Sequence, residues 1–257
     1  MRDRMSGAVA PEHAPPPVQP TRSGRAWRRQ TGRAPDGAVV AVSGVGALSG
    51  DWFWSLRATS PRASVGLTVG AAGYLGLRAA EFPTPVEAVT YRGRELALRS
   101  GGTAAEPRWL AGLRGARHDL MCAGPGAPPR LADLVALLAD LDPADAPGGL
   151  VLRTRGDTRL WGVCGRQYVA GVGTLTVYPR AEAAGLVPAT PGKAVAHGRL
   201  WTTTAGFAPG TGGYFVHAGP TAVAMVRDER GIEADASDAS VADLLESLRV
   251  DWAGAPS

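Results

Sequence analysis

The chain has 257 residues, 45% of them hydrophobic, which is enough to bury one large core or two small ones. Its formal net charge is +4, but residues 1–35 hold seven arginines and two acids, whereas residues 227–257 hold three arginines and eight acids. Lys193 is the only lysine and asparagine is absent, a bias that we attribute to a GC-rich genome. The abundance of arginine therefore does not by itself indicate a nucleic-acid-binding protein.

Two cysteines, Cys122 and Cys164, are too few for a disulfide framework, and we expect both to be reduced and buried. No apolar segment of the signal-peptide type follows the basic N-terminus. The most apolar stretch, 63–77, is shorter than the roughly 20 residues of a membrane-spanning helix. These features predict a cytoplasmic protein without a transmembrane segment.

Residues 1–35 are predicted to form a disordered arm rich in proline and arginine, followed by a single globular domain over 36–257. The last part of the arm places basic side chains beside an aromatic one, a pattern that can bind nucleic acid or anionic lipid. The residues concerned are Arg25, Trp27, Arg28, Arg29 and Arg33. Because only these few arginines cluster, we give this interaction less weight than binding to another protein.

The first third of the domain is predicted to consist of short strands, because its apolar residues alternate or form β-branched runs. These strands lie near 38–43, 52–58, 64–69, 87–91 and 94–99. A weak helix is expected at 71–80, where two glycines lower the helical propensity. Arg92 and Gly93 separate the last two strands, which predicts a two-residue hairpin turn.

The most distinct unit spans about 117–154. A buried strand is predicted at 118–123, a helix at 130–141 with leucines three and four residues apart, and a second strand at 150–153. Strand, helix and strand within this length predict a parallel βαβ pair with a right-handed crossover.

Within that helix, Leu134 and Leu138 are predicted to face the core. Further strands are expected near 160–164, 169–178, 199–203, 214–217 and 221–226, with a last helix at 241–248. No internal repeat of fixed period is visible in the sequence. We therefore predict an α/β or α+β fold, with one mixed-sheet domain that contains the βαβ unit.

Cofactor and metal motifs are not apparent. The glycine-rich segment 44–50 departs from the spacing of dinucleotide- and phosphate-binding loops. His118 and Cys122, four positions apart on a predicted strand, have no further ligands nearby and are expected to pack in the core. We predict neither a cofactor nor a metal.

The best candidate for an enzyme site is the pair His197 and His217, which flank a glycine-rich segment. Histidines on neighbouring strands beside a mobile loop can supply a general acid and a general base. Candidate ligand-binding residues around this loop are Phe207, Gly210, Gly212, Gly213 and Tyr214. In the alternative interpretation, both histidines are ordinary strand residues.

Because no catalytic motif is recognisable, the leading hypothesis is a non-catalytic binding or assembly module whose partner is another protein. The alternative is a hydrolase- or transferase-type enzyme with its site in the His197/His217 region.

Overall fold

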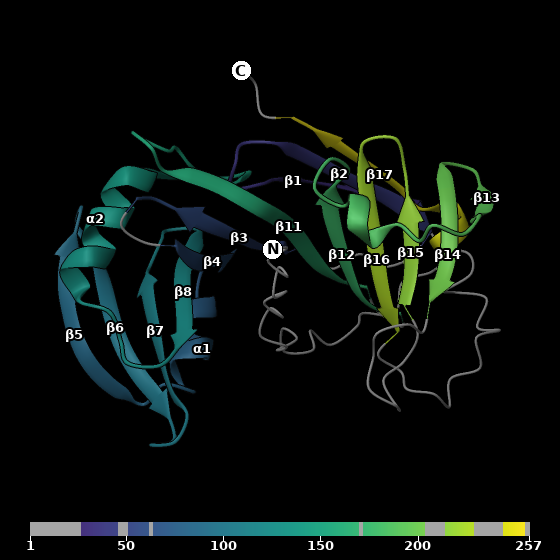
Figure 1. Cartoon of the computed structure of the whole chain (residues 1–257). Helices are drawn as coiled ribbons and strands as arrows, with labels where there is room; N and C mark the ends of the chain where they lie inside the picture. The colour runs from purple at the N-terminus through teal and green to yellow at the C-terminus, as the bar shows by residue number, and fades with distance from the viewer. Residues whose placement is uncertain are drawn as a thin grey trace, which may run out of the picture.

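The computed structural model describes residues 27–45, 51–61, 64–169, 172–203, 214–228 and 244–254 (Figure 1). Its elements in chain order are β1 (Trp27–Arg33), β2 (Val39–Val45), β3 (Phe53–Thr59), β4 (Ser64–Ala71), α1 (Tyr74–Ala79), β5 (Thr84–Tyr91), β6 (Arg94–Gly102), β7 (Pro107–Leu113), β8 (His118–Pro125), α2 (Leu131–Leu141), β9 (Pro143–Ala146), β10 (Gly149–Leu152), β11 (Arg159–Val169), β12 (Gly173–Pro179), the 3-10 turn η1 (Ala184–Leu186), β13 (Lys193–Val195), β14 (Gly198–Thr203), β15 (Tyr214–Ala218), β16 (Ala222–Asp228) and β17 (Arg249–Ala253). A further helical turn covers 244–247.

Twelve strands form one sheet in the order β13-β14-β15-β16-β12-β11-β3-β4-β8-β7-β6-β5. Strands β1, β2 and β17 form a second sheet, and β9 and β10 form a two-stranded ladder. The main core lies on one face of the large sheet, where α2, the small sheets and the turn at 244–247 pack. Figure 1 shows the long strand β11 running from the strands around α2 to those around β12 and β16.

The predicted α/β or α+β fold with a mixed sheet is wrong, because every strand pair among the described residues is antiparallel. The βαβ unit expected over 117–154 does not form, since β8 pairs with β4 and β7, and β10 pairs with β9. Asp142, in a left-handed backbone conformation (φ 39°), ends α2, and the chain enters the β9–β10 hairpin directly. The segment 117–154 is long enough for a parallel crossover, but the chain after α2 forms a hairpin instead.

Several local predictions are confirmed. Helix α2 forms where its leucines indicated, and Leu134 and Leu138 are both buried. The β5–β6 hairpin turns at Arg92 and Gly93, which both have positive φ (48° and 75°), as a type I′ turn requires. Strand β1, however, begins at Trp27, within the segment predicted to be an arm.

The fold contains two repeats with the same order of elements. The first runs from β2 to β9, and the second runs from β10 to β17. In each repeat, two strands, a short helical segment and four further strands build one half of the large sheet. Equivalent strands follow in the same order from the edge to the centre of the sheet in both halves. The central pair, β3 and β11, is therefore a pair of equivalent strands.

Strand register fixes which residues correspond. The first edge hairpin turns after Tyr91 and the second after Val195, a spacing of 104 residues from Tyr91 to Val195. The same spacing holds for the following strands, because β6–β7–β8 and β14–β15–β16 have matching registers. Leu113 in the first repeat therefore corresponds to His217 in the second.

The correspondence continues to the centre of the sheet. The ladders β8–β4 and β16–β12 place Leu67 and Leu175 at equivalent positions. The next ladders, β4–β3 and β12–β11, do the same for Trp54 and Gly165. Trp54 and Gly165 also pair with each other. A pseudo-twofold axis therefore passes between these two residues.

The two repeats exchange their terminal strands. The last strand of the first repeat, β9, pairs with the first strand of the second, β10, while β17 pairs with β2. The buried leucines before these last strands also match in spacing: Leu137, Leu138 and Leu141 in one repeat, and Leu244, Leu245 and Leu248 in the other. This exchange joins both repeats to one core.

Candidate functional site

Within the described residues, one face of the large sheet is covered at its two sides. Helix α1 covers strands of the first repeat, where Leu75 packs against Leu110 and Met121. The chain around η1 covers strands of the second repeat, where Ala183 packs against Val216. Between these covers lie β3, β4, β11 and β12, over which the described part of the chain places no helix. The side chains there are mostly half-buried.

We name this surface the central face. It consists of alternate residues of β3, β4, β11, β12 and β16, and aromatic, arginine and hydroxyl side chains dominate it. Its members are Phe53, Ser55, Arg57, Thr59, Ser64, Thr68, Arg159, Trp161, Cys164, Arg166, Tyr168, Thr174, Thr176, Tyr178, Met225 and Arg227. None of these residues carries a carboxylate.

The neighbouring strand β8 presents one carboxylate on this side of the sheet, Asp119, and it is buried and fully engaged. Its Oδ2 accepts bonds from the backbone N–H groups of Gly73 and Leu75, both at 2.9 Å. Its Oδ1 accepts a bond from the N–H of Gly115 at 3.2 Å. Asp119 thus fixes the start of α1 through three bonds from backbone N–H groups.

Trp161 lies near the start of β11, directly before a bulge in that strand. The register with β3 shifts between Trp161 and Cys164, and Gly162 within the bulge has a left-handed backbone (φ 62°). The side chain of Trp161 remains 48% exposed. Its Nε1–H donates to the hydroxyl of Thr59 at 2.9 Å, which holds the indole in one orientation. Bulges commonly redirect a side chain in this way.

Arg57 lies directly opposite Trp161 in the β3–β11 ladder. The carbon of its guanidinium group is 5.4 Å from the centre of the indole ring, a cation–π contact. One terminal nitrogen donates to the hydroxyl of Ser64 at 3.4 Å, and that hydroxyl lies 3.0 Å from the hydroxyl of Thr59. Trp161, Arg57 and these two hydroxyls form one polar-aromatic cluster.

Farther along β11, the central face holds a thiol and a phenol in a poorly solvated setting. Burial raises the pKa of Tyr178 to about 12, and burial likewise raises the pKa of Cys164, although the charge of Arg166 opposes both shifts. Both groups therefore stay protonated at neutral pH, when a thiol is a poor nucleophile. Among the members of the central face there is no histidine or carboxylate that could activate a hydroxyl.

The predicted histidine pair is divided between the core and the surface. His217 on β15 is 1% exposed, and neither ring nitrogen has a hydrogen-bond partner in the described part of the protein. Burial lowers its pKa to about 4, and the nearby charge of His197 contributes in the same direction. His197 lies exposed in the β13–β14 turn. The structure therefore brings the two residues near each other without a hydrogen bond between them.

The other predicted binding residues are only partly placed. The loop residues Phe207, Gly210, Gly212 and Gly213 lie outside the described residues, as does Arg25 of the arm. Tyr214 begins β15 and is half-buried, with the Arg227 guanidinium 5.9 Å from its ring centre. Trp27 and Arg28 belong to β1, and Arg29 and Arg33 on the same strand are exposed.

Two polar clusters lie elsewhere. In the first, Nδ1 of His118 is 2.8 Å from Oδ1 of Asp145, whose Oδ2 accepts a bond from the backbone N–H of Arg117 at 2.9 Å. Burial alone raises the pKa of Asp145, but the bonds from His118 and Arg117 outweigh it and the pKa is lowered. No hydroxyl or thiol is bonded to His118 among the described residues, so the pair fastens β8 to β9.

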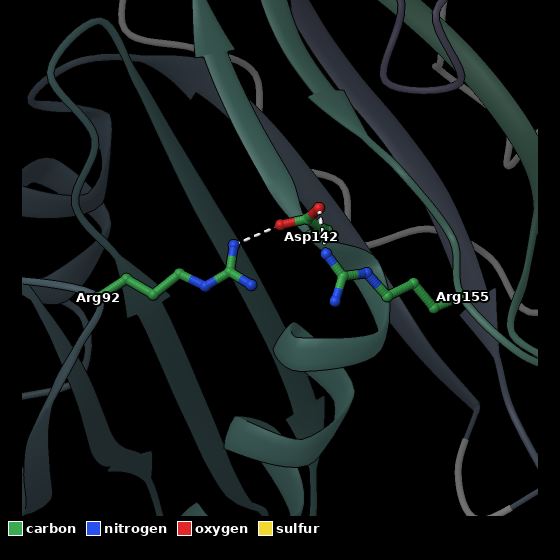
Figure 2. A network of polar contacts seen from close by, with 3 residues as sticks. All are labelled: Arg92, Asp142 and Arg155. Atoms are coloured by element: carbon green, nitrogen blue, oxygen red, sulfur yellow. Dashed lines mark hydrogen bonds and ion pairs between the residues drawn. The ribbon is translucent and has the colours of Figure 1, made fainter.

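The second cluster joins the two described non-glycine residues with positive φ, Arg92 and Asp142. Figure 2 shows the carboxylate of Asp142 between the guanidinium groups of Arg92 and Arg155, and the bond to Arg155 measures 2.7 Å. The bond from Arg92, followed by that from Arg155, lowers the pKa of Asp142. Both oxygens of Asp142 are thus engaged, and the cluster ties the β5–β6 turn to the end of α2.

Sequence reasoning missed the central face, although two signals were present. In β3, the apolar residues Trp54, Leu56 and Ala58 alternate with polar ones, which marks a strand with one polar face. The Trp161-Gly162 pair lies inside a predicted strand, where glycine commonly marks a bulge. Neither signal shows that β3 and β11 are neighbours, so Arg57 and Trp161 could not be joined before the sheet order was known.

No protein-family model, curated protein or solved structure matches the chain. Within the described ranges, no group of three or more His, Cys, Asp and Glu side chains is arranged to hold a metal ion. None of the helices described is long and apolar enough to cross a bilayer.

Proposed function

We propose that the protein is a non-catalytic binding module that docks another protein on its central face. The observation that carries this proposal is the exposed Trp161, which Thr59 and Arg57 hold in place on a surface without carboxylates. Protein interfaces are enriched in tryptophan, tyrosine, methionine and arginine, and depleted in lysine, aspartate and glutamate. A side chain that is fixed in advance also loses little conformational entropy on binding.

A protein partner fits this face better than single-stranded nucleic acid. Base stacking needs aromatic rings with open faces. Here the guanidinium of Arg57 lies over the Trp161 ring, and Phe53 and Tyr74 contact each other edge to face with centres 4.7 Å apart. The rings therefore support neighbouring groups instead of forming a stacking platform.

Peptide selection tests the proposal without assuming the partner's identity. A phage-displayed random peptide library is selected on the immobilised full-length protein, and the enriched peptides are synthesised and titrated by tryptophan fluorescence. We expect binding that is lost in Trp161→Ala and retained in Val39→Ala, which truncates an exposed side chain on β2, away from the central face. Enriched peptides that bind Trp161→Ala as well as the unmodified protein would contradict the proposal.

A further inference from the structure

We propose that Arg57 and Trp161 form a binding site for a carboxylate, which receives an aspartate or glutamate side chain from an acidic, extended segment of the partner. This inference rests on the proposed function and names the chemistry of the partner at the same surface.

Arg57 has hydrogen-bonding capacity that the described protein does not use. Its Nε is buried without a hydrogen-bond partner, and its guanidinium makes no ion pair with any carboxylate of the described residues. Among the described residues, its side chain makes one hydrogen bond, the long bond to Ser64. A guanidinium offers five N–H donors, so its terminal nitrogens can still donate to an incoming anion.

The orientation of Arg57 is set before any ligand arrives. The indole of Trp161 supports the guanidinium group, and the indole is itself held by Thr59 and by the bulge at Gly162. A guanidinium group supported by an aromatic ring keeps its N–H donors available at its edge, and that planar fork matches the two oxygens of a carboxylate. The exposed part of the Trp161 ring can contact an aliphatic side chain next to the bound acid.

Further cations follow the same two central strands. Arg159 is exposed and lies opposite Thr59, two residues from Arg57 along β3. Arg166 lies opposite Phe53, four residues from Arg57 in the other direction, which is roughly 13 Å along an extended strand. Because no member of the central face is acidic, this row of arginines complements a segment that carries several carboxylates. Charge complementarity of this kind sets partner choice and orientation.

A designed peptide pair tests the site in the full-length protein. The acidic probe repeats the sequence Glu-Leu-Asp-Ser and carries fluorescein, and its control repeats Gln-Leu-Asn-Ser. By fluorescence anisotropy, we expect the control to bind about 10-fold or more weakly than the acidic peptide, as expected for a hydrogen bond between charged groups. Arg57→Gln should weaken binding of the acidic peptide by a similar factor.

Two variants distinguish a specific carboxylate site from nonspecific electrostatic attraction. Arg57→Lys keeps the charge but loses the planar fork, so it should lose most of the affinity that Arg57→Gln loses. Arg114→Gln removes the same charge from the exposed turn after β7 and should change the affinity by less than about twofold. Thermal melts that match the unmodified protein show that the variants are folded.

Equal effects of Arg57→Gln and Arg114→Gln, or no saturable binding of the acidic peptide, would overturn the carboxylate site. Tighter, Arg57-dependent binding of a labelled oligothymidylate would overturn it in favour of nucleic acid. The outcome also distinguishes this inference from the proposed function. Library-selected peptides that require Trp161 but not Arg57 would remove the carboxylate site and leave the binding face standing, whereas independence from both residues would remove both.

Discussion

Trp54 and Gly165 pair with each other across β3 and β11, and each holds in its own repeat the position that the other holds in the second repeat. Exact symmetry would place identical residues on both sides of the axis. There is no room for this, because a Cβ atom at Gly165 would lie 2.6 Å from Cζ3 of Trp54 and 2.8 Å from Cζ3 of Trp52. One repeat supplies the tryptophan, and the other supplies the space for it.

Gly165→Ala is therefore expected to destabilise the protein. Rings packed from two neighbouring tryptophans cannot move away easily, and overpacking of this kind costs about 1–3 kcal/mol. Urea unfolding followed by tryptophan fluorescence measures the change. The matched control is Gly66→Ala on β4, where a Cβ meets nothing within 4 Å and the change should stay within about 0.5 kcal/mol. Equal stability of both variants would show that the tryptophan rings move to make room for the added methyl group.

The exchange of terminal strands predicts that the two repeats remain associated when the chain is cut. The turn at Pro147 and Gly148 joins β9 to β10, so a break there separates the repeats without interrupting a strand. Co-expressed fragments 1–147 and 148–257 should elute together as a one-to-one complex. Each fragment alone would expose the edge of β3 or β11 as well as an unpaired terminal strand. Fragments that elute separately would show that the exchanged strands contribute little to association.

Local patterns in the sequence predict many of these elements but not their arrangement. The leucine spacing places α2, and Arg92-Gly93 places the edge hairpin, because both signals lie within a few residues of each other. The pairing of β3 with β11 brings Trp54 next to Gly165, which lies more than a hundred positions away in the sequence. The local spacing of apolar residues does not indicate a contact over such a separation. The length of the 117–154 unit predicts a parallel crossover, but length does not distinguish a crossover from a helix followed by a hairpin.

The repeat is hidden for a related reason. Corresponding positions have diverged in chemistry, as in Leu113 and His217, or in size, as in Trp54 and Gly165. Backbone register is kept because hydrogen bonds between strands do not depend on the side chain. The candidate site follows from this divergence, since the bulge that exposes Trp161 is found on β11 and not on β3.

Leu134→Ala and Leu138→Ala are each expected to destabilise the protein by about 2–5 kcal/mol. Both side chains are buried in the main core beneath α2, so truncation removes apolar contacts and leaves a cavity. Guanidinium unfolding at neutral pH measures the loss. Ala132→Ser, at an exposed position of the same helix, should change stability by less than about 0.5 kcal/mol. Losses that small at both leucines would mean that α2 contributes little to the core.

His217 is expected to make the protein sensitive to acid. Its pKa is ordinarily 6.5, and burial lowers it to about 4 in the folded protein. As the pH falls, the unfolded chain therefore binds a proton before the folded chain does, which favours unfolding. The contribution of His217 should be fully present above pH 6.5 and lost progressively as the pH falls toward 4.

His217→Leu tests this, because leucine is the residue at the corresponding position, Leu113, in the first repeat. The substitution removes two buried ring nitrogens that lack partners among the described residues, so stability should rise at neutral pH as well. Unfolding is followed from pH 7 to pH 4, and the difference between variant and unmodified protein should grow as the pH falls, which isolates the histidine from the titration of carboxylates. His197→Gln, which changes an exposed residue, should keep most of the acid sensitivity, since burial is the larger cause of the lowered pKa. A difference that stays constant with pH would show that His217 gains a partner when it is protonated.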